Sequence, residues 1–215
     1  MRLHEVTSLL DPLYEAFLDG FQDGFPDQEQ IRLSVVHRIV KAKTLSATAP
    51  ADAPLDPFAA SMHLLVAVAE DEQPCGLAMW QDCHNGVAYL LYLWVDPARR
   101  GAGLGSRIYR GVLDQARATM GEARALTCEV ERPDVAQSLT QAQDAVRRIA
   151  FYQRLGARLA SNVVYVQHCG RDTVPPLLMH LMIHPLAPLS EAEMLDIMSD
   201  CYGEAMQRPE RLELV

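Results

Sequence analysis

The segment from Leu93 to Ser106 constrains the fold more than any other part of the sequence. Its residues, LWVDPARRGAGLGS, end an apolar run of strand length and pass through three alternating glycines into a helical pattern. The first N–H groups of a helix lack intrahelical acceptors, and the helix dipole adds positive potential there. Glycine lets an oxyanion approach the backbone because it has no Cβ. This strand, turn and helix therefore predict a phosphate or pyrophosphate site.

Apolar runs on both sides of this segment predict an α/β fold with a mixed sheet. The runs 62–70, 75–83 and 87–95 have strand length, and Asn85-Gly86 is a strong hairpin signal, so we expect an antiparallel meander. Further strands are predicted at 2–6, 125–130, 158–168 and 174–184, and helices at 8–21, 104–120, 142–155 and 190–207. Another helix is expected to start after Asp27, which would cap it with a return contact from Gln30. The segment 45–61 is predicted to be a loose connection. Together these elements predict a splayed, mostly antiparallel sheet with helices on both faces, in which βαβ follows the meander.

Composition limits the class of protein. The 215 residues predict one domain over 1–215, with 186–215 as a C-terminal helical extension. The net charge of −9 disfavours nucleic acid as a partner, and the longest apolar runs are too short for a membrane span. Five scattered cysteines and no secretion signal predict reduced thiols in the cytoplasm. The histidines and cysteines lack the spacing of a metal site, so no metal is predicted.

Two ligands compete for the glycine turn. A dinucleotide site requires G-x-G-x-x-G followed by an acidic residue, and Gly101, Gly103, Ser106 and Glu129 approach that pattern. The strands before the turn form a hairpin meander, however, whereas a dinucleotide fold opens with a parallel unit. A coenzyme A site is the other interpretation of the turn.

The turn closely resembles the pyrophosphate loop of the GCN5-related N-acetyltransferases (GNAT). The family pattern is V-x-P followed by R/Q-x-x-G-x-G/A, and here Val95, Pro97, Arg100, Gly103 and Gly105 match it. The second family motif, F-Y-x-x-x-G, is matched by residues 151–156. The order of elements is similar to that of the family from residue 1 to about 185. Two motifs in the right order make the resemblance specific.

The resemblance implies an N-acetyltransferase that moves an acetyl or other acyl group from acetyl-CoA directly to an amine of a small molecule or peptide. Tyr152 resembles the family's proton donor to the leaving thiolate. The residues expected to hold the co-substrate are Leu93, Val95, Arg100, Gly101, Ala102, Gly103, Leu104, Gly105 and Ser106. The family often has Asn and Ala where this chain has Ala145 and Arg148, so the contact supplied by that Asn is not predicted. A non-catalytic CoA-binding module is the alternative, and a dinucleotide oxidoreductase is a more distant one.

The acceptor side is predicted from acidic and aromatic residues. Glu129 and Glu131 lie two apart on a strand, so both face the side opposite Cys128. They either line a cleft that holds a cationic amine or mark a solvated strand end. Phe25 is a third candidate, because the connection between the first two helices borders the acceptor in the family. Since Cys128 lies on the opposite face, no covalent enzyme intermediate is expected.

Two surface features complete the predictions. Arg99, Arg100, Arg107 and Arg110 form a basic cluster that is expected to attract the CoA phosphates. The last helix carries a capping box at Ser190 and an apolar face that must be buried against its own domain or a second copy, so a homodimer is considered.

Overall fold

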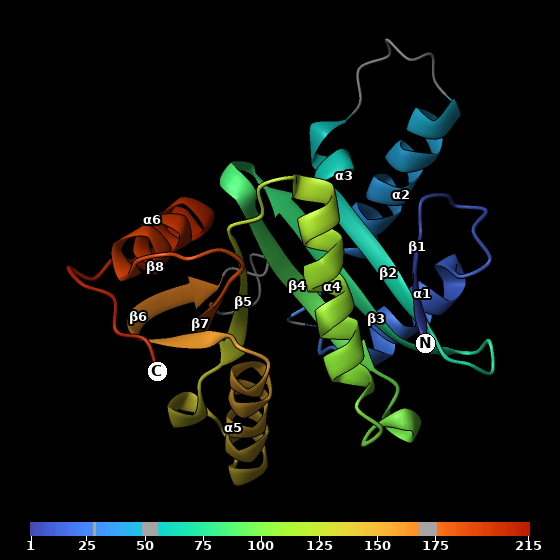
Figure 1. The fold of residues 1–215 in the computed structure, drawn as a ribbon. Coiled ribbons are helices and arrows are strands. Elements are labelled where there is room, and N and C mark those ends of the chain that lie inside the picture. Colours follow the sequence, from blue (N-terminus) through green and yellow to red (C-terminus); the bar gives the residue numbers. More distant parts are fainter. Residues whose placement is uncertain (28, 49–55, 168–175) are drawn as a thin grey trace. The chain divides into compact units, whose positions relative to one another are not determined.

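The computed structural model describes residues 1–27, 29–48, 56–167 and 176–215 (Figure 1). These residues form two compact units. Unit 1 comprises the described residues within 1–82 and 91–115, and unit 2 those within 83–90, 116–167 and 176–215. Each unit is described by itself below.

The strands follow the order β1-β2-β3-β4-β5-β7-β6-β8, which confirms the predicted mixed, mostly antiparallel sheet. Their bounds are β1 (Arg2–Glu5), β2 (Met62–Val68), β3 (Pro74–Cys83), β4 (Val87–Val95), β5 (Ala125–Glu131), β6 (Arg158–Gln167), β7 (Leu177–Pro185) and β8 (Met206–Gln207). Asn85 and Gly86 both have positive φ, as the predicted tight turn before β4 requires. The start predicted for β7 at 174 lies outside the described residues.

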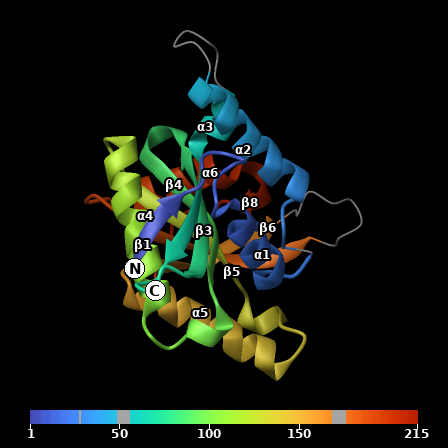
Figure 2. The ribbon, with the colours of Figure 1, turned by 90° about the vertical axis from the view of Figure 1, so that its right-hand side faces the viewer.

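In unit 1 the helices cover both faces of the strands. The α4 helix (Leu104–Met120) runs along one face, and α1 (Tyr14–Gly24) and α2 (Leu33–Thr48) lie on the other (Figure 1, Figure 2). The amphipathic α1 helix buries Phe17 and Phe21 completely in a core shared with β2 and β3. This packing fixes the strands that lead into the glycine turn.

Two predictions about the helices of unit 1 were wrong. The second helix begins at Leu33, because Gln30 does not cap it: its side-chain Nε2 donates to the carbonyls of Phe25 (2.6 Å) and Gln22 (3.1 Å). The segment 45–61 is not only a loose connection. It contains the end of α2 and the short α3 helix (Pro57–Ser61), whose cap Asp56 accepts hydrogen bonds from two backbone N–H groups.

In unit 2 the start of β4 pairs in parallel with β5, from Val87↔Ala125 to Leu90↔Cys128, and β5 pairs antiparallel with β7. The α5 helix (Leu139–Arg154) begins at a Ser138 cap, and α6 (Glu191–Tyr202) begins with the predicted capping box. Short 3-10 turns lie at His84–Gly86, Pro97–Arg99, Pro133–Val135 and Gly203–Ala205.

The C-terminal segment contains a strand in addition to the predicted helix. The last helix ends at Tyr202, and β8 then pairs with β6. Leu159 and Val215 exchange two backbone hydrogen bonds of 2.8 and 3.0 Å. The apolar face of α6 packs within the core of unit 2, so it gives no support for a homodimer.

Candidate functional site

The glycine turn of unit 1 starts where β4 ends. The Asp96 carboxylate accepts a hydrogen bond from Ala98 N (2.9 Å), and Asp96 N donates to the Cys75 carbonyl (3.1 Å), which ties the turn to β3. Gly101 and Gly103 have φ of +87° and +73°, a region that side chains disfavour. A Cβ built on either glycine would meet no heavy atom within 4 Å. The space above both backbones is therefore open.

This open turn fits the diphosphate of a coenzyme A molecule. The α4 helix begins at Leu104, and Arg107 N donates to Gly103 O across its start at 3.1 Å. The preceding N–H groups point out of the helix end without intrahelical acceptors. The nine residues predicted to hold the co-substrate thus form one continuous strand, turn and helix.

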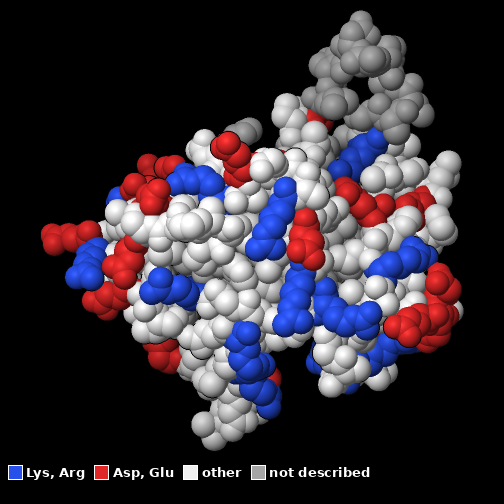
Figure 3. Space-filling view, viewed as in Figure 1, with Lys and Arg blue, Asp and Glu red and all other residues white. Residues whose placement is uncertain are grey.

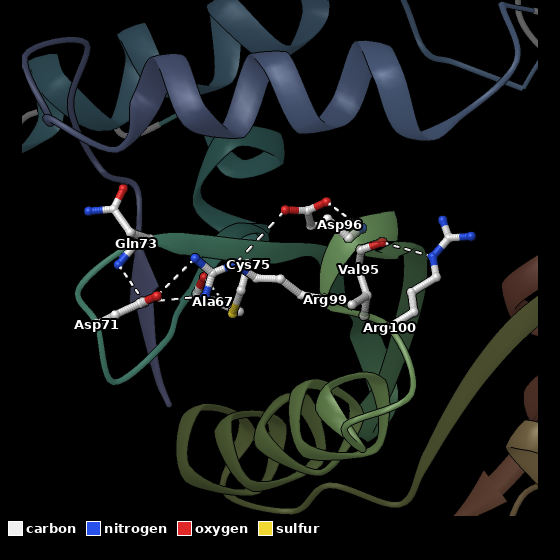
Figure 4. Close-up of polar contacts among 9 residues, drawn as sticks. Ala67, Asp71, Gln73, Cys75, Val95, Asp96, Arg99 and Arg100 are labelled. Carbon is white, nitrogen blue, oxygen red and sulfur yellow. Dashed lines mark hydrogen bonds and ion pairs between the residues drawn. The ribbon is translucent and has the colours of Figure 1, made fainter.

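The four arginines of the predicted basic cluster have different partners and do not act as one group. The Arg99 guanidinium donates two hydrogen bonds to Asp71, of 3.3 and 2.9 Å, which joins the β2–β3 connection to the turn (Figure 4). These bonds hold the pKa of Asp71 below its usual range. Arg100 uses Nε to donate to the Val95 carbonyl (3.1 Å) and turns its guanidinium to solvent (Figure 4). Arg100, rather than Arg99, is thus the arginine placed to meet an anion.

The other two arginines lie along α4, where basic side chains gather in Figure 3. Arg107 and Arg110 line a shallow depression of about 430 Å³ together with Gly111, Met1 and Leu3. The Arg107 guanidinium is also 4.0 Å from Glu70. These two side chains therefore belong to the surface beside β1.

Tyr152 lies in the last turns of α5 and is only 7% exposed. Its ring packs edge-on against Phe151, with centroids 5.0 Å apart. Burial raises the pKa of the Tyr152 hydroxyl well above its usual value, and the nearby Cys128 thiol adds to this. The hydroxyl is therefore protonated at neutral pH and is a hydrogen-bond donor.

Glu129 lies in a compartment of unit 2 that the sequence analysis did not foresee. One carboxylate oxygen, Oε2, accepts a 2.7 Å bond from Gln167 Nε2, and the other, Oε1, is buried with no hydrogen-bond partner among the described residues. Burial raises the pKa of Glu129, while the hydroxyls of Tyr165 and Tyr89 lower it. The enclosed Glu129 carboxylate, with Gln167 on one oxygen and the two tyrosine hydroxyls beside it, is thus a group of unit 2 that could receive a ligand's N–H group.

Aromatic rings enclose this compartment. Tyr202 of α6 packs edge-on against Tyr165 at 5.0 Å and against Tyr89 at 5.8 Å. These tyrosines and Gln167 come from three elements far apart in the sequence. In the sequence, the strand residues among them show only the alternation of inward-facing positions. Every core residue of a strand shows that alternation, so it could not identify these residues as part of a site.

Glu131 has a different environment from Glu129. Its carboxylate pairs with Arg148 of α5, a partner that the sequence did not reveal. Of the two acids that the sequence places on one face of the strand, Glu129 is thus enclosed and Glu131 is ion-paired.

Phe25 lies in unit 1, in the connection between α1 and α2. Its ring packs at 4.8 Å against Tyr92 and at 6.0 Å against Phe21. Tyr92 also holds the backbone of this connection: its hydroxyl donates to Glu29 O (2.8 Å) and accepts from Ile31 N (2.9 Å). Phe25 is thus half-buried in the aromatic cluster that anchors the loop.

The fold and the glycine turn define an acyl-CoA-dependent transferase, and the comparisons name the family. The Acetyltransferase (GNAT) family matches residues 14–157, so the chain belongs to the GNAT acetyltransferases. A comparison with curated proteins gave no match.

Solved structures share the fold at low sequence identity. A putative GNAT acetyltransferase from Bacteroides thetaiotaomicron is 22% identical, with a TM-score of 0.66 over 94% of this chain and 99% of that one. A GNAT acetyltransferase from Elizabethkingia anophelis with acetyl-CoA bound is 11% identical, with a TM-score of 0.54 over 86% and 97%. The ribosomal-protein-S18-alanine N-acetyltransferase from Escherichia coli is 16% identical, with a TM-score of 0.53 over 88% and 97%.

Two features are absent from the described residues. None of their helices combines the length and apolarity that crossing a bilayer requires. They also contain no group of three or more His, Cys, Asp or Glu side chains arranged to hold a metal ion.

Proposed function

We propose that this GNAT acetyltransferase transfers the acetyl group of acetyl-CoA directly to a cationic amine of a small molecule or peptide. The observation that carries the amine assignment is the enclosed carboxylate of Glu129, whose Oε1 is buried and meets no donor of the described residues at hydrogen-bond geometry. An ammonium N–H satisfies that oxygen, and the surrounding tyrosine rings favour a cation over a neutral group. The proposal includes a cytoplasmic location, and none of the cysteines in the described residues is joined in a disulfide.

The glycine turn is assigned to the co-substrate. Its open backbone and the N–H groups at the start of α4 suit the two phosphates, and the exposed head of Arg100 adds charge there. Phe25 is assigned to the wall of the acceptor loop, with its ring held by Tyr92.

Glu129 and Tyr152 have separate roles in the proposed reaction. The amine nitrogen must lose a proton before it attacks the thioester carbon, and a carboxylate whose pKa is raised is a better proton acceptor. As the new C–N bond forms and the C–S bond breaks, negative charge develops on sulfur. Because burial raises the pKa of Tyr152, its role is to donate a hydrogen bond to that sulfur, and release of its proton is uphill.

The two side chains lie on opposite faces of β5. Glu129 alternates with Cys128 along the strand, and Tyr152 lies on the side of Cys128. The proposal therefore brings the amine from the α6 face and the thioester from the α5 face.

The proposal is tested by supplying acetyl-CoA with a panel of amines and measuring free thiol. Thiol release that depends on a cationic amine is expected, with weaker turnover of neutral analogues of equal size. Thermal shift with CoA and with NAD is the companion measurement, since a ligand that binds the native state raises its melting temperature. Stabilisation by CoA without turnover of any amine would favour the CoA-binding module, and stabilisation by NAD alone would favour the oxidoreductase.

A further inference from the structure

Two half-buried cysteines meet in unit 2, although they lie far apart in the sequence. Cys83 is the last residue of β3, and Cys201 lies in the final turn of α6. Their side chains are in hydrogen-bond contact, and both pack against the core of unit 2. The connection that follows β3 lies beside α6 in Figure 1. Neither thiol has a part in the proposed acetyl transfer.

The surroundings of Cys201 favour its thiolate. The contact with Cys83 and the Thr127 hydroxyl, 3.7 Å from the Cys201 sulfur, lower the pKa of Cys201 against the opposing effect of burial. Burial instead raises the pKa of Cys128, and also that of Cys75, whose thiol donates to the Ala67 carbonyl. Cys201 is therefore expected to be more nucleophilic than Cys75 or Cys128.

We propose that Cys83 and Cys201 form a reversible disulfide, a modification site that ties the end of α6 to the end of β3. The oxidant is a small-molecule disulfide such as oxidised glutathione. The Cys201 thiolate attacks one of its sulfurs and releases one glutathione thiolate, which leaves a mixed disulfide on Cys201. The Cys83 thiol then loses its proton, attacks the Cys201 sulfur and releases the second glutathione. Two protein thiols are oxidised, and one glutathione disulfide is reduced to two thiols.

The bond would have a local consequence. Tyr202 follows Cys201 and packs against Tyr165 and Tyr89, whose hydroxyls act on Glu129. Tying α6 at Cys201 therefore restrains the rings that enclose that carboxylate.

The test uses the full chain in glutathione buffers, with reduced-to-oxidised ratios from about 100:1 to about 1:100. Free thiols are alkylated, and the protein is digested and mapped by mass spectrometry. A cross-linked Cys83–Cys201 peptide should appear as the buffer becomes oxidising, while Cys75 and Cys128 are alkylated only after denaturation. Reduction should restore both free thiols.

The variants separate the pair from other thiols. Cys83→Ser should leave Cys201 as the mixed disulfide with glutathione, and Cys201→Ser should abolish the cross-link. Cys169→Ser removes a cysteine outside the described residues and should leave the cross-link intact. Free Cys83 and Cys201 at every ratio, or a Cys201 link that disappears in Cys169→Ser, would overturn the proposal.

Discussion

The glycine turn of unit 1 is a site made of backbone groups, whereas the Glu129 compartment of unit 2 is made of side chains. The turn is one continuous stretch of backbone, open to solvent, in which the side chains at Gly101 and Gly103 must be absent. The compartment is made of side chains from separate strands and a helix around one buried carboxylate. A backbone site of this kind is sensitive to added atoms, whereas a side-chain site is sensitive to lost ones. Each prediction below tests that difference.

The largest effect is expected at Gly103. Gly103→Val places a branched side chain in the open space of the turn and strains a φ of +73°. Binding of CoA should weaken by about 10³-fold or more, equivalent to about 4 kcal/mol, as measured by calorimetry. Gly121→Val is the matched control, because Gly121 has φ of +67° and equally open space at the other end of α4. Gly121→Val is expected to destabilise the protein about as much as Gly103→Val while CoA binding stays intact. If both variants lost CoA binding equally, backbone strain alone would explain the loss at Gly103.

Tyr152→Phe removes one hydroxyl from unit 2. If that hydroxyl donates a hydrogen bond to the leaving thiolate, kcat should fall by about 10² to 10³-fold while the acetyl-CoA KM changes little. Tyr14→Phe is the control, since it also removes a buried tyrosine hydroxyl, one that lies 3.2 Å from His37 Nδ1. Unchanged kcat in Tyr152→Phe across the pH range would show that this hydroxyl does not act on the leaving sulfur.

Glu129→Gln should raise the acceptor KM by about 10- to 100-fold, as expected for the loss of a charged hydrogen bond, and should leave CoA binding intact. The control is Glu131→Gln on the same strand, where the acid is paired with Arg148. A larger rise of the acceptor KM in Glu131→Gln would show that the amine binds at Glu131, at the end of β5.

The same Glu129 variant has a pH signature. Because burial raises the pKa of Glu129, folding favours the protonated carboxyl, and its contribution to stability is lost as pH rises through the folded pKa. Glu129→Gln cannot ionise, so the variant should become more stable relative to the wild type as pH increases. Denaturant unfolding across pH measures this, and a difference independent of pH would contradict it.

The last prediction concerns the packing behind the turn. A Cβ on Gly24 of α1 would lie 2.4 Å from Trp94 Cδ1 and under 3 Å from two more atoms of the indole ring. Gly24→Ala should therefore destabilise the protein by about 1–3 kcal/mol in denaturant unfolding. Gly111→Ala is the control, because its Cβ would also lie at 2.4 Å, but from the end of the flexible Leu3 side chain. Equal losses would mean that Trp94 has room to move.

The sequence predicts contiguous features well. The strand, turn and helix from 93 to 106, the Asn85-Gly86 turn and the Ser190 capping box each depend on neighbouring residues, and the structure has all three. Helix starts were less certain, since Gln30 donates to two carbonyls that only the fold brings near it.

The side-chain site was predictable only in part. The spacing of Glu129 and Glu131 gave their common face, but their partners come from distant elements. Gln167 meets Glu129, and Arg148 meets Glu131, through the pairing of β5 with β7 and the packing of α5. Long-range contacts of this kind leave no local pattern, so burial of one acid and pairing of the other could not be told apart.

The hydroxyl of Tyr92 has a consequence for how specificity can change. It holds the connection between α1 and α2 through the backbone of Glu29 and Ile31, so the anchor of this loop belongs to β4. The side chains of the loop do not take part in those two bonds. The exposed positions Pro26 and Asp27 can therefore be randomised in a library without breaking these bonds, whereas Gln30 must be kept because its side chain donates to the carbonyls of Phe25 and Gln22. Variants with new acceptors can be selected at those two positions while the anchor of the loop stays constant.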